Sequence, residues 1–251
     1  MKNKKIFVIV MAAGKGTRIG ATDKPKVMFE VLNKPIIEWA IRPLEKLKDE
    51  GIVERIIVVV GFLGNQVIDY LEKRAEFVWQ RKQLGTAHAV MMAENLLEKE
   101  DGYTIIVNGD HALYSQATYQ KMINEATLKN LTLGFATVVS KRFESYGRVI
   151  RDSQGKPVEV IEVPEATAEQ KIIKEKSINL YIADNKWLFG ALPKIQKSAV
   201  KKEYYIVDIV KMAIDEGANV EAIAIEDEDE ALGINTLEDK AETERVLERR
   251  G

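Results

Sequence analysis

A short apolar run that leads directly into small residues constrains the fold of this chain more than any other stretch. Residues 6–11 read IFVIVM, which has the length and composition of a strand buried on both faces. Residues 12–16, AAGKG, follow at once. Small residues let the backbone turn tightly and approach a ligand closely, so several N–H groups could point at one anion. This pattern predicts a strand that ends in a phosphate-binding loop.

Basic residues surround this loop. They are Lys15, Arg18, Lys24 and Lys26. Their charge and the main-chain dipoles could converge on a triphosphate, although a plain turn with solvated lysines would have the same composition. Two known phosphate loops fit poorly. A Walker A loop requires Gly-Lys-Ser/Thr where residues 16–18 read GTR, and the dinucleotide fingerprint requires a small residue where Ile19 stands. Nicotinamide binding is therefore a distant alternative.

Composition narrows the class of protein and the kind of metal site. The 251 residues are 46% hydrophobic and 30% charged, as in soluble globular proteins. The net charge of −2 offers no general attraction to nucleic acid or membrane, and no stretch looks like a signal peptide or a membrane span, so we expect a cytoplasmic protein. There is no cysteine and there are two histidines. We therefore expect any metal to be held by oxygen, as Mg²⁺ is.

Apolar strands alternate with amphipathic helices along most of the chain. Strands are expected at 6–11, 56–60, 77–80, 103–107, 131–138 and 220–225. Helices are expected at 35–47, 64–73, 85–98 and 237–249, and residues 202–208 open another helix that ends at about 216. This rhythm predicts an α/β fold with a Rossmann-like, mixed, mostly parallel sheet and helices on both faces. Two short strands around a turn at 153–155 suggest an inserted acceptor-binding lobe. We expect one domain, 1–251, with a nucleotide-binding part at about 1–138 and 205–251 and the lobe at about 139–204.

Two later stretches could reach the same edge of the sheet. Gly85 and Thr86 open a predicted helix, so their backbone is available to a ligand, although a plain capped helix would look the same. Asp110 follows a predicted strand and a glycine. A carboxylate there is placed to hold a cation over a phosphate, and an ordinary turn is the alternative.

Taken together, the motifs resemble those of the sugar-nucleotide pyrophosphorylases. The opening MAAGKGTRIG, followed by KPKVMFEVLNKPIIEWAI, resembles the start of that family, and in particular the uridylyltransferase half of the bifunctional enzyme that makes UDP-N-acetylglucosamine. Three further stretches match, QRKQLGT at 80–86, NGD at 108–110 and LGIN at 232–235. The similarity covers nearly the whole chain. The hexapeptide repeats of the acetyltransferase half do not occur, so acetyl transfer is not implied.

The resemblance implies a nucleotide-diphospho-sugar transferase-like fold, Mg²⁺ as cofactor, and UTP and a sugar 1-phosphate as substrates, with N-acetylglucosamine 1-phosphate first among acceptors. It implies catalytic roles for Arg18 and Lys26. The implied nucleotide-binding residues are Ala12, Ala13, Gly14, Lys15, Gly16, Thr17, Gln80, Gln83, Gly85, Thr86 and Asp110. The implied acceptor-binding residues are Gly147, Glu162, Asn179 and Asn235, and the metal ligands are Asp110 and Asn235. His88 is expected to have a structural role.

On the acceptor side the chain differs from the family pattern. His111-Ala112 stands where the family has Val-Pro, Pro164 replaces a lysine, and Leu180 and Tyr181 replace Thr and Gly. These changes add bulk and remove a hydroxyl beside the implied sugar site. They favour a second hypothesis, transfer to another sugar 1-phosphate or to a non-sugar phosphate, with dTTP and CTP left open as donors. A nucleotide-sugar sensor without turnover is the alternative of a different class. The sequence does not indicate the oligomeric state.

Overall fold

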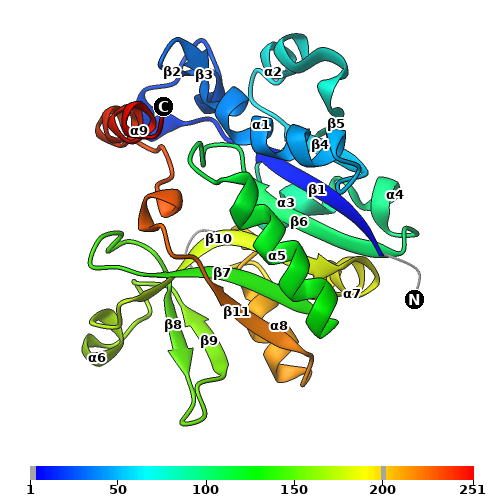
Figure 1. Cartoon of the computed structure of the whole chain (residues 1–251), viewed down its shortest axis with the longest axis vertical. Helices are drawn as coiled ribbons and strands as arrows, with labels where there is room; N and C mark the ends of the chain where they lie inside the picture. Colours follow the sequence, from blue (N-terminus) through cyan, green and yellow to red (C-terminus); the bar gives the residue numbers. More distant parts are fainter. Residues whose placement is uncertain (1–3, 199–201) are drawn as a thin grey trace.

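A computed structural model describes residues 4–198 and 202–251, and its centre is a nine-stranded sheet (Figure 1). Seven of its strands follow the order β11-β7-β10-β6-β1-β4-β5. Their bounds are β1 Lys5–Ala12, β4 Arg55–Val60, β5 Glu76–Trp79, β6 Gly102–Asn108, β7 Leu133–Val139, β10 Glu175–Asp184 and β11 Val220–Ala224. β1 pairs in parallel with both β4 and β6, and β10 runs antiparallel to β6 and β7. The sheet is therefore mixed and mostly parallel, as predicted.

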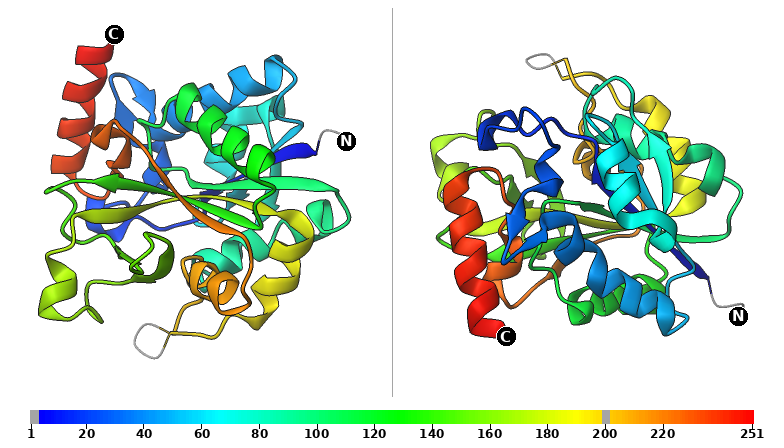
Figure 2. Two further views of the ribbon diagram at one scale, coloured as in Figure 1. Left: turned by 60° about the horizontal axis from the view of Figure 1, so that its bottom comes forward. Right: turned by 90° about the horizontal axis from the view of Figure 1, so that it is seen from above.

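Side chains of β1 alternate between two hydrophobic cores, because successive residues of a strand point to opposite faces. Ile6, Val8 and Val10 pack in one core, and Phe7 and Ile9 in the other. Helices α1 (Ile36–Asp49), α2 (Asn65–Leu71) and α5 (Gln116–Lys129) cover the first face; α3 (Thr86–Met91), α4 (Glu94–Leu97), α7 (Asn185–Ala191) and α8 (Asp208–Asp215) cover the second. The resulting three layers are seen edge-on in Figure 2.

An extension of the sheet lies beside these layers. Its elements are β8 (Arg148–Arg151), β9 (Pro157–Ile161) and α6 (Ala168–Lys171), at the lower left of Figure 1. β8 pairs with β9 and, at one position, with β10. The range expected to form the acceptor-binding lobe therefore also contributes its longest strand, β10, to the centre of the main sheet.

The last helix of the chain packs beside a small ribbon formed by residues 30–35. The strands β2 (Glu30–Val31) and β3 (Lys34–Pro35) form a small ribbon. The last helix, α9 (Leu237–Arg250), packs beside this ribbon, where Glu244 accepts a hydrogen bond from the Leu32 backbone N–H. Within the described part of the chain, no helix is both long and apolar enough to cross a lipid bilayer.

Local predictions and structure differ at several places. The helix expected at 85–98 is two helices, because the N–H groups of Met92 and Ala93 bond carbonyls three residues back and end the first helix. The helix α5 was not predicted. Its buried face includes Thr118 and Tyr119, so its apolar periodicity is weak. Neither β10 nor α7 was predicted, because residues 175–191 fall within the range assigned to the lobe.

Candidate active site

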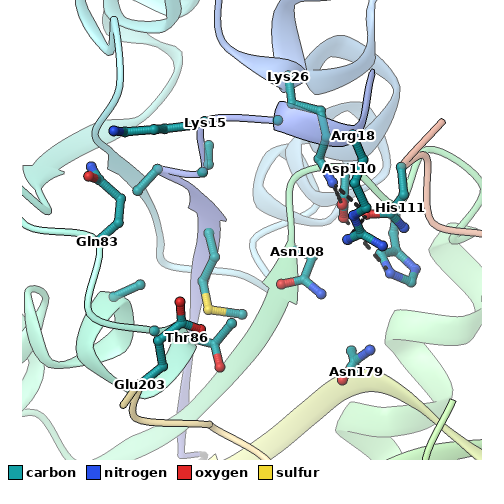
Figure 3. A pocket seen from close by; sticks show the side chains of 18 of the residues that line it. Lys15, Arg18, Lys26, Gln83, Thr86, Asn108, Asp110, His111, Asn179 and Glu203 are labelled. Carbon is teal, nitrogen blue, oxygen red and sulfur yellow. Dashed lines mark hydrogen bonds and ion pairs between the residues drawn. The ribbon is translucent and has the colours of Figure 1, made fainter. Parts of the chain in front are cut away.

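A cavity of about 740 Å³ opens at the carboxyl ends of β1 and β6, where ligands of open α/β sheets bind. Every residue predicted for nucleotide, acceptor or metal binding lines it. Figure 3 shows Arg18, Lys26 and Asp110 grouped on one side, with Gln83 and Thr86 on the opposite side. The structure thus brings together residues from the two ends of the sequence.

The loop after β1 has the backbone shape that its glycines suggested. Gly16 has φ of +72°, and a Cβ there would lie 2.6 Å from the Cβ of Lys26, so only glycine fits. Residues 17–19 then form a short 3-10 turn. Gly14, Lys15 and Thr17 are exposed, which leaves the loop open to a ligand.

Four polar side chains from four separate segments meet on one side of the cavity. Lys26 Nζ donates to Asp110 Oδ2 and, at 3.0 Å, to Asn235 Oδ1. Arg18 Nη2 donates to the same Asn235 oxygen at 2.8 Å. Burial alone would raise the pKa of Asp110, but the charge of Lys26 outweighs it and holds the pKa below its usual value. Asp110 is therefore ionised at neutral pH.

The second oxygen of Asp110 has an environment that a bound cation would complete. Oδ1 is buried and accepts no hydrogen bond. A buried carboxylate oxygen without a partner is costly unless a ligand completes it. Within residues 4–198 and 202–251, no group of three or more His, Cys, Asp or Glu side chains could hold a metal by itself. Asp110 and Asn235 suit a hard cation that takes its other ligands from phosphate and water.

Opposite this cluster, two segments are fastened to each other by hydrogen bonds. The Tyr204 N–H donates to Leu84 O at 2.8 Å, and the Tyr204 carbonyl oxygen accepts a hydrogen bond from the Ala87 N–H at 3.0 Å. The Ile206 N–H donates to Thr86 Oγ1 at 2.9 Å. Gly85, between them, has φ of +109°, and a Cβ there would lie 2.3 Å from Tyr204 O. We name these two segments, 84–87 and 204–206, the base strap.

The side chains predicted to read the base are held by local contacts. Gln80 is 3% exposed, and its Nε2 donates to Gly85 O at 2.9 Å and lies 3.0 Å from His88 Nδ1. Gln83 donates to Gln80 O at 3.1 Å. His88 thus contacts the predicted base-reading amide, in line with the structural role expected for it. Burial, with the charge of Lys197, lowers the pKa of His88.

At the acceptor end, β10 has an irregularity that aims a side chain at the cavity. Its register against β7 shifts between Ser177 and Tyr181, and Asn179 there has φ of +56°. Asn179 extends from β10 into the cavity in Figure 3. Leu180 and Tyr181, by contrast, are fully buried on the two faces of the sheet and do not line the cavity. Their added bulk therefore lies outside the cavity lining, but the Tyr181 hydroxyl donates to Asn179 Oδ1 at 3.4 Å, beside the implied sugar site.

Other lining residues were given no binding role from the sequence, although His111 and Pro164 stood out as departures from the family pattern. They include Asn108, His111, Ser145, Tyr146, Pro164, Ser177 and Glu203. The Asn108 side chain points into the middle of the cavity in Figure 3, from the last position of β6. Its place at a strand end, two residues before Asp110, is a signal that could have identified it.

Comparison with known proteins agrees with this geometry. A family model described as nucleotidyl transferase matches residues 7–230. The chain is 35% identical over 242 residues to the bifunctional protein GlmU of Limosilactobacillus reuteri, 32% over 246 residues to that of Geobacillus sp. strain WCH70, and 34% over 244 residues to that of Lactococcus lactis. These alignments cover 96%, 98% and 97% of the chain but 52% of each relative. The chain therefore spans about half the length of these curated relatives.

Proposed function

This chain belongs to the nucleotidyl transferase family and is a nucleotidyltransferase, and from that premise we propose that it transfers the uridylyl group of UTP to a sugar 1-phosphate. N-acetylglucosamine 1-phosphate is the first candidate acceptor. The observation that carries the proposal is the single cavity in which the loop at 12–18, the Lys26–Asp110–Asn235 cluster and Asn179 face one another.

In the proposed reaction, an oxygen of the acceptor phosphate attacks the α-phosphorus of UTP. The bond from that phosphorus to the oxygen of the β-phosphate breaks on the opposite side, and pyrophosphate leaves. The attacking oxygen belongs to the substrate, so no protein nucleophile is required. Orientation of the two substrates and neutralisation of their charge supply the acceleration.

Each part of the site has a role in this scheme. Backbone N–H groups of residues 14–17 and the Arg18 guanidinium hold the β- and γ-phosphates. Lys26 neutralises charge at the α-phosphoryl group. Gln80, Gln83 and the base strap hold the uracil, while Gly147, Glu162 and Asn179 hold the acceptor. The nucleotide-binding part and the acceptor-binding part thus meet across one cavity.

Asp110 and Asn235 would hold the divalent cation of the reaction. Asp110 Oδ1 is a buried oxygen without a hydrogen-bond partner, and Asn235 Oδ1 already faces two cationic side chains, so both oxygens fit a cation. A bound Mg²⁺ would supply positive charge to the phosphates of both substrates. Because asparagine is neutral, it leaves more of that charge for the phosphates.

The test measures pyrophosphate release from UTP and Mg²⁺ with N-acetylglucosamine 1-phosphate, with glucose 1-phosphate, and without acceptor. Release that depends on the N-acetylated sugar would support the proposal in full. Release with another acceptor would keep nucleotidyl transfer and reject the proposed sugar. Tight UTP binding without release from any acceptor in a broad panel would instead favour a sensor.

Two lysines of the same turn provide a matched pair of variants. Lys26→Met is expected to lower turnover about 10²- to 10³-fold, because it removes a preorganised charge. Lys24 lies over the Phe29 ring and does not line the cavity, so Lys24→Met should turn over close to the wild-type rate. Equal turnover of the two variants would reject the role given to Lys26.

Two lining residues favour an acceptor other than N-acetylglucosamine 1-phosphate. Pro164 lines the cavity where the family pattern has a lysine, so that donor is missing from the acceptor end. His111 also lines the cavity. Transfer to another sugar 1-phosphate or to a phosphorylated alcohol is therefore the alternative that the acceptor panel decides.

A further inference from the structure

His111 is a buried side chain in the cavity to which the proposed mechanism gives no role. It is 3% exposed, and its ring stacks on Tyr114 with 5.1 Å between centroids and an interplanar angle of 6°. The stack and the surrounding packing hold the ring in one orientation. His111 is also one of the two histidines in the chain.

The ring nitrogen Nε2 borders both segments that supply the expected metal ligands. It lies 3.9 Å from Asp110 Oδ1, the buried oxygen that accepts no hydrogen bond. On its other side is Gly233, two residues before Asn235; a Cβ on Gly233 would lie 2.8 Å from Nε2. The absence of a side chain at Gly233 lets the loop that carries Asn235 lie against the imidazole.

The distance between Nε2 and Asp110 Oδ1 is compatible with one shared ion. Oxygen and nitrogen ligands bind small divalent ions such as Mg²⁺ and Zn²⁺ at about 2.0–2.2 Å, so two ligand atoms of one such ion lie at most roughly 4.4 Å apart. The observed 3.9 Å is within that limit. A hydrogen bond between the two atoms would require a much shorter distance. The two atoms are therefore close enough to bind one ion, and they are too far apart to bond each other.

We propose that His111 Nε2 is a third protein ligand of the divalent cation, beside Asp110 and Asn235, and that it shifts the preference of the site from Mg²⁺ toward Mn²⁺ and Co²⁺. Imidazole nitrogen binds transition metals well, whereas Mg²⁺ prefers oxygen. The inference rests on the proposed function in one respect, because it assumes that the site binds a divalent cation and a nucleotide. It does not depend on which acceptor is used.

The experiment is pulsed electron paramagnetic resonance of Mn²⁺ bound with UTP in the absence of any acceptor. A coordinated imidazole gives a ¹⁴N modulation of the Mn²⁺ signal. We expect this modulation in the wild-type protein and in His88→Gln, which removes the other histidine, and its loss in His111→Val. Mn²⁺ affinity in His111→Val should fall about tenfold, the range seen when a metal site loses a supporting group. Mg²⁺ affinity should fall less.

Wild-type protein labelled with [¹⁵N]histidine gives a second readout. This readout needs no substitution, so it does not require that a variant folds correctly. The label should convert the ¹⁴N pattern to that of ¹⁵N. The inference is overturned if Mn²⁺ binds without a histidine nitrogen signal, if the signal persists in folded His111→Val, or if Mn²⁺ does not bind at all with UTP. The experiment contains no acceptor, so a histidine nitrogen signal would stand even if the protein fails to transfer to a sugar. Conversely, the absence of that signal would not contradict pyrophosphate release with Mg²⁺.

Discussion

Lys26 contacts both side chains that are proposed to bind a cation. Its ammonium group donates to Asp110 Oδ2 and to Asn235 Oδ1 in the absence of ligands. The same ammonium is proposed to move to the α-phosphoryl group when a nucleotide binds. A nucleotide would then draw Lys26 away from both side chains and leave their charge and oxygens to the cation, so cation and nucleotide should enter together.

This competition predicts that Lys26→Met, which lowers turnover, raises the affinity of the protein for a divalent cation. In Lys26→Met, the Asp110 carboxylate loses its buried partner, and a divalent cation no longer competes with an ammonium. Mn²⁺ affinity of the nucleotide-free protein should therefore rise about tenfold, although turnover falls. This affinity can be measured by titration, with the electron paramagnetic resonance signal of free Mn²⁺ as the readout. Lys24→Met is the control. Equal affinities in the three proteins would show that Lys26 does not compete with the cation for Asp110 and Asn235.

Among the elements, the base strap depends on a backbone conformation that only glycine adopts easily. Gly85→Ala should lower the free energy of unfolding by about 2 kcal/mol or more, since it forces a side chain into a positive-φ residue pressed against Tyr204 O. Gly190→Ala in α7 is the control, because a Cβ there meets nothing within 4 Å and alanine favours helix. Denaturant unfolding of both variants measures the difference. A Gly85→Ala protein as stable as Gly190→Ala would show that the strap is pliable.

Helix α8 begins with a carboxylate whose environment disfavours its charge. Burial, and then repulsion from Glu165, raise the pKa of Asp208 from 3.8 to about 6. The folded state therefore binds this proton more tightly than the unfolded state, so stability should fall as pH rises from about 4 to 6 and the penalty persists above that range. The helix dipole favours a negative charge here, but burial outweighs it.

Asp208→Asn should remove this penalty. We expect the variant to be more stable than the wild type at pH 7–8, by less than about 1 kcal/mol because the side chain is only half-buried, and equal to it below about pH 4. Thermal unfolding across this range measures the difference. The exposed Asp215 at the other end of α8 supplies the control, Asp215→Asn. A stability difference for Asp208→Asn that does not depend on pH would contradict the assigned cause.

For the molecule as a whole, the sequence predicted the parts of the site that follow directly from strand ends. The loop at 12–18 and Asp110 come immediately after β1 and β6, and parallel strands bring such ends to one edge. The acceptor end was less predictable. Whether Leu180 and Tyr181 face the cavity or the core depends on the register shift in β10, and a one-residue change in register reverses the face of a side chain. That shift is a property of strand pairing rather than of local sequence.

The same strand connects the two proposed parts of the protein. β10 pairs with β8 near its beginning and with β6 near its end. We therefore expect one cooperative unfolding transition, with fluorescence and circular dichroism giving the same midpoint. Two separated midpoints would show that the extension carrying β8 and β9 unfolds by itself.

The base strap has a consequence for amide hydrogen exchange. The N–H groups of Tyr204 and Ile206 are bonded to Leu84 and Thr86, so they exchange with solvent only when the two segments separate. A nucleotide that holds 84–87 in place would slow this exchange at both amides even if it does not touch them. Those two amides would therefore act as natural probes of nucleotide occupancy, readable by hydrogen–deuterium exchange without any chemical modification of the protein or the ligand.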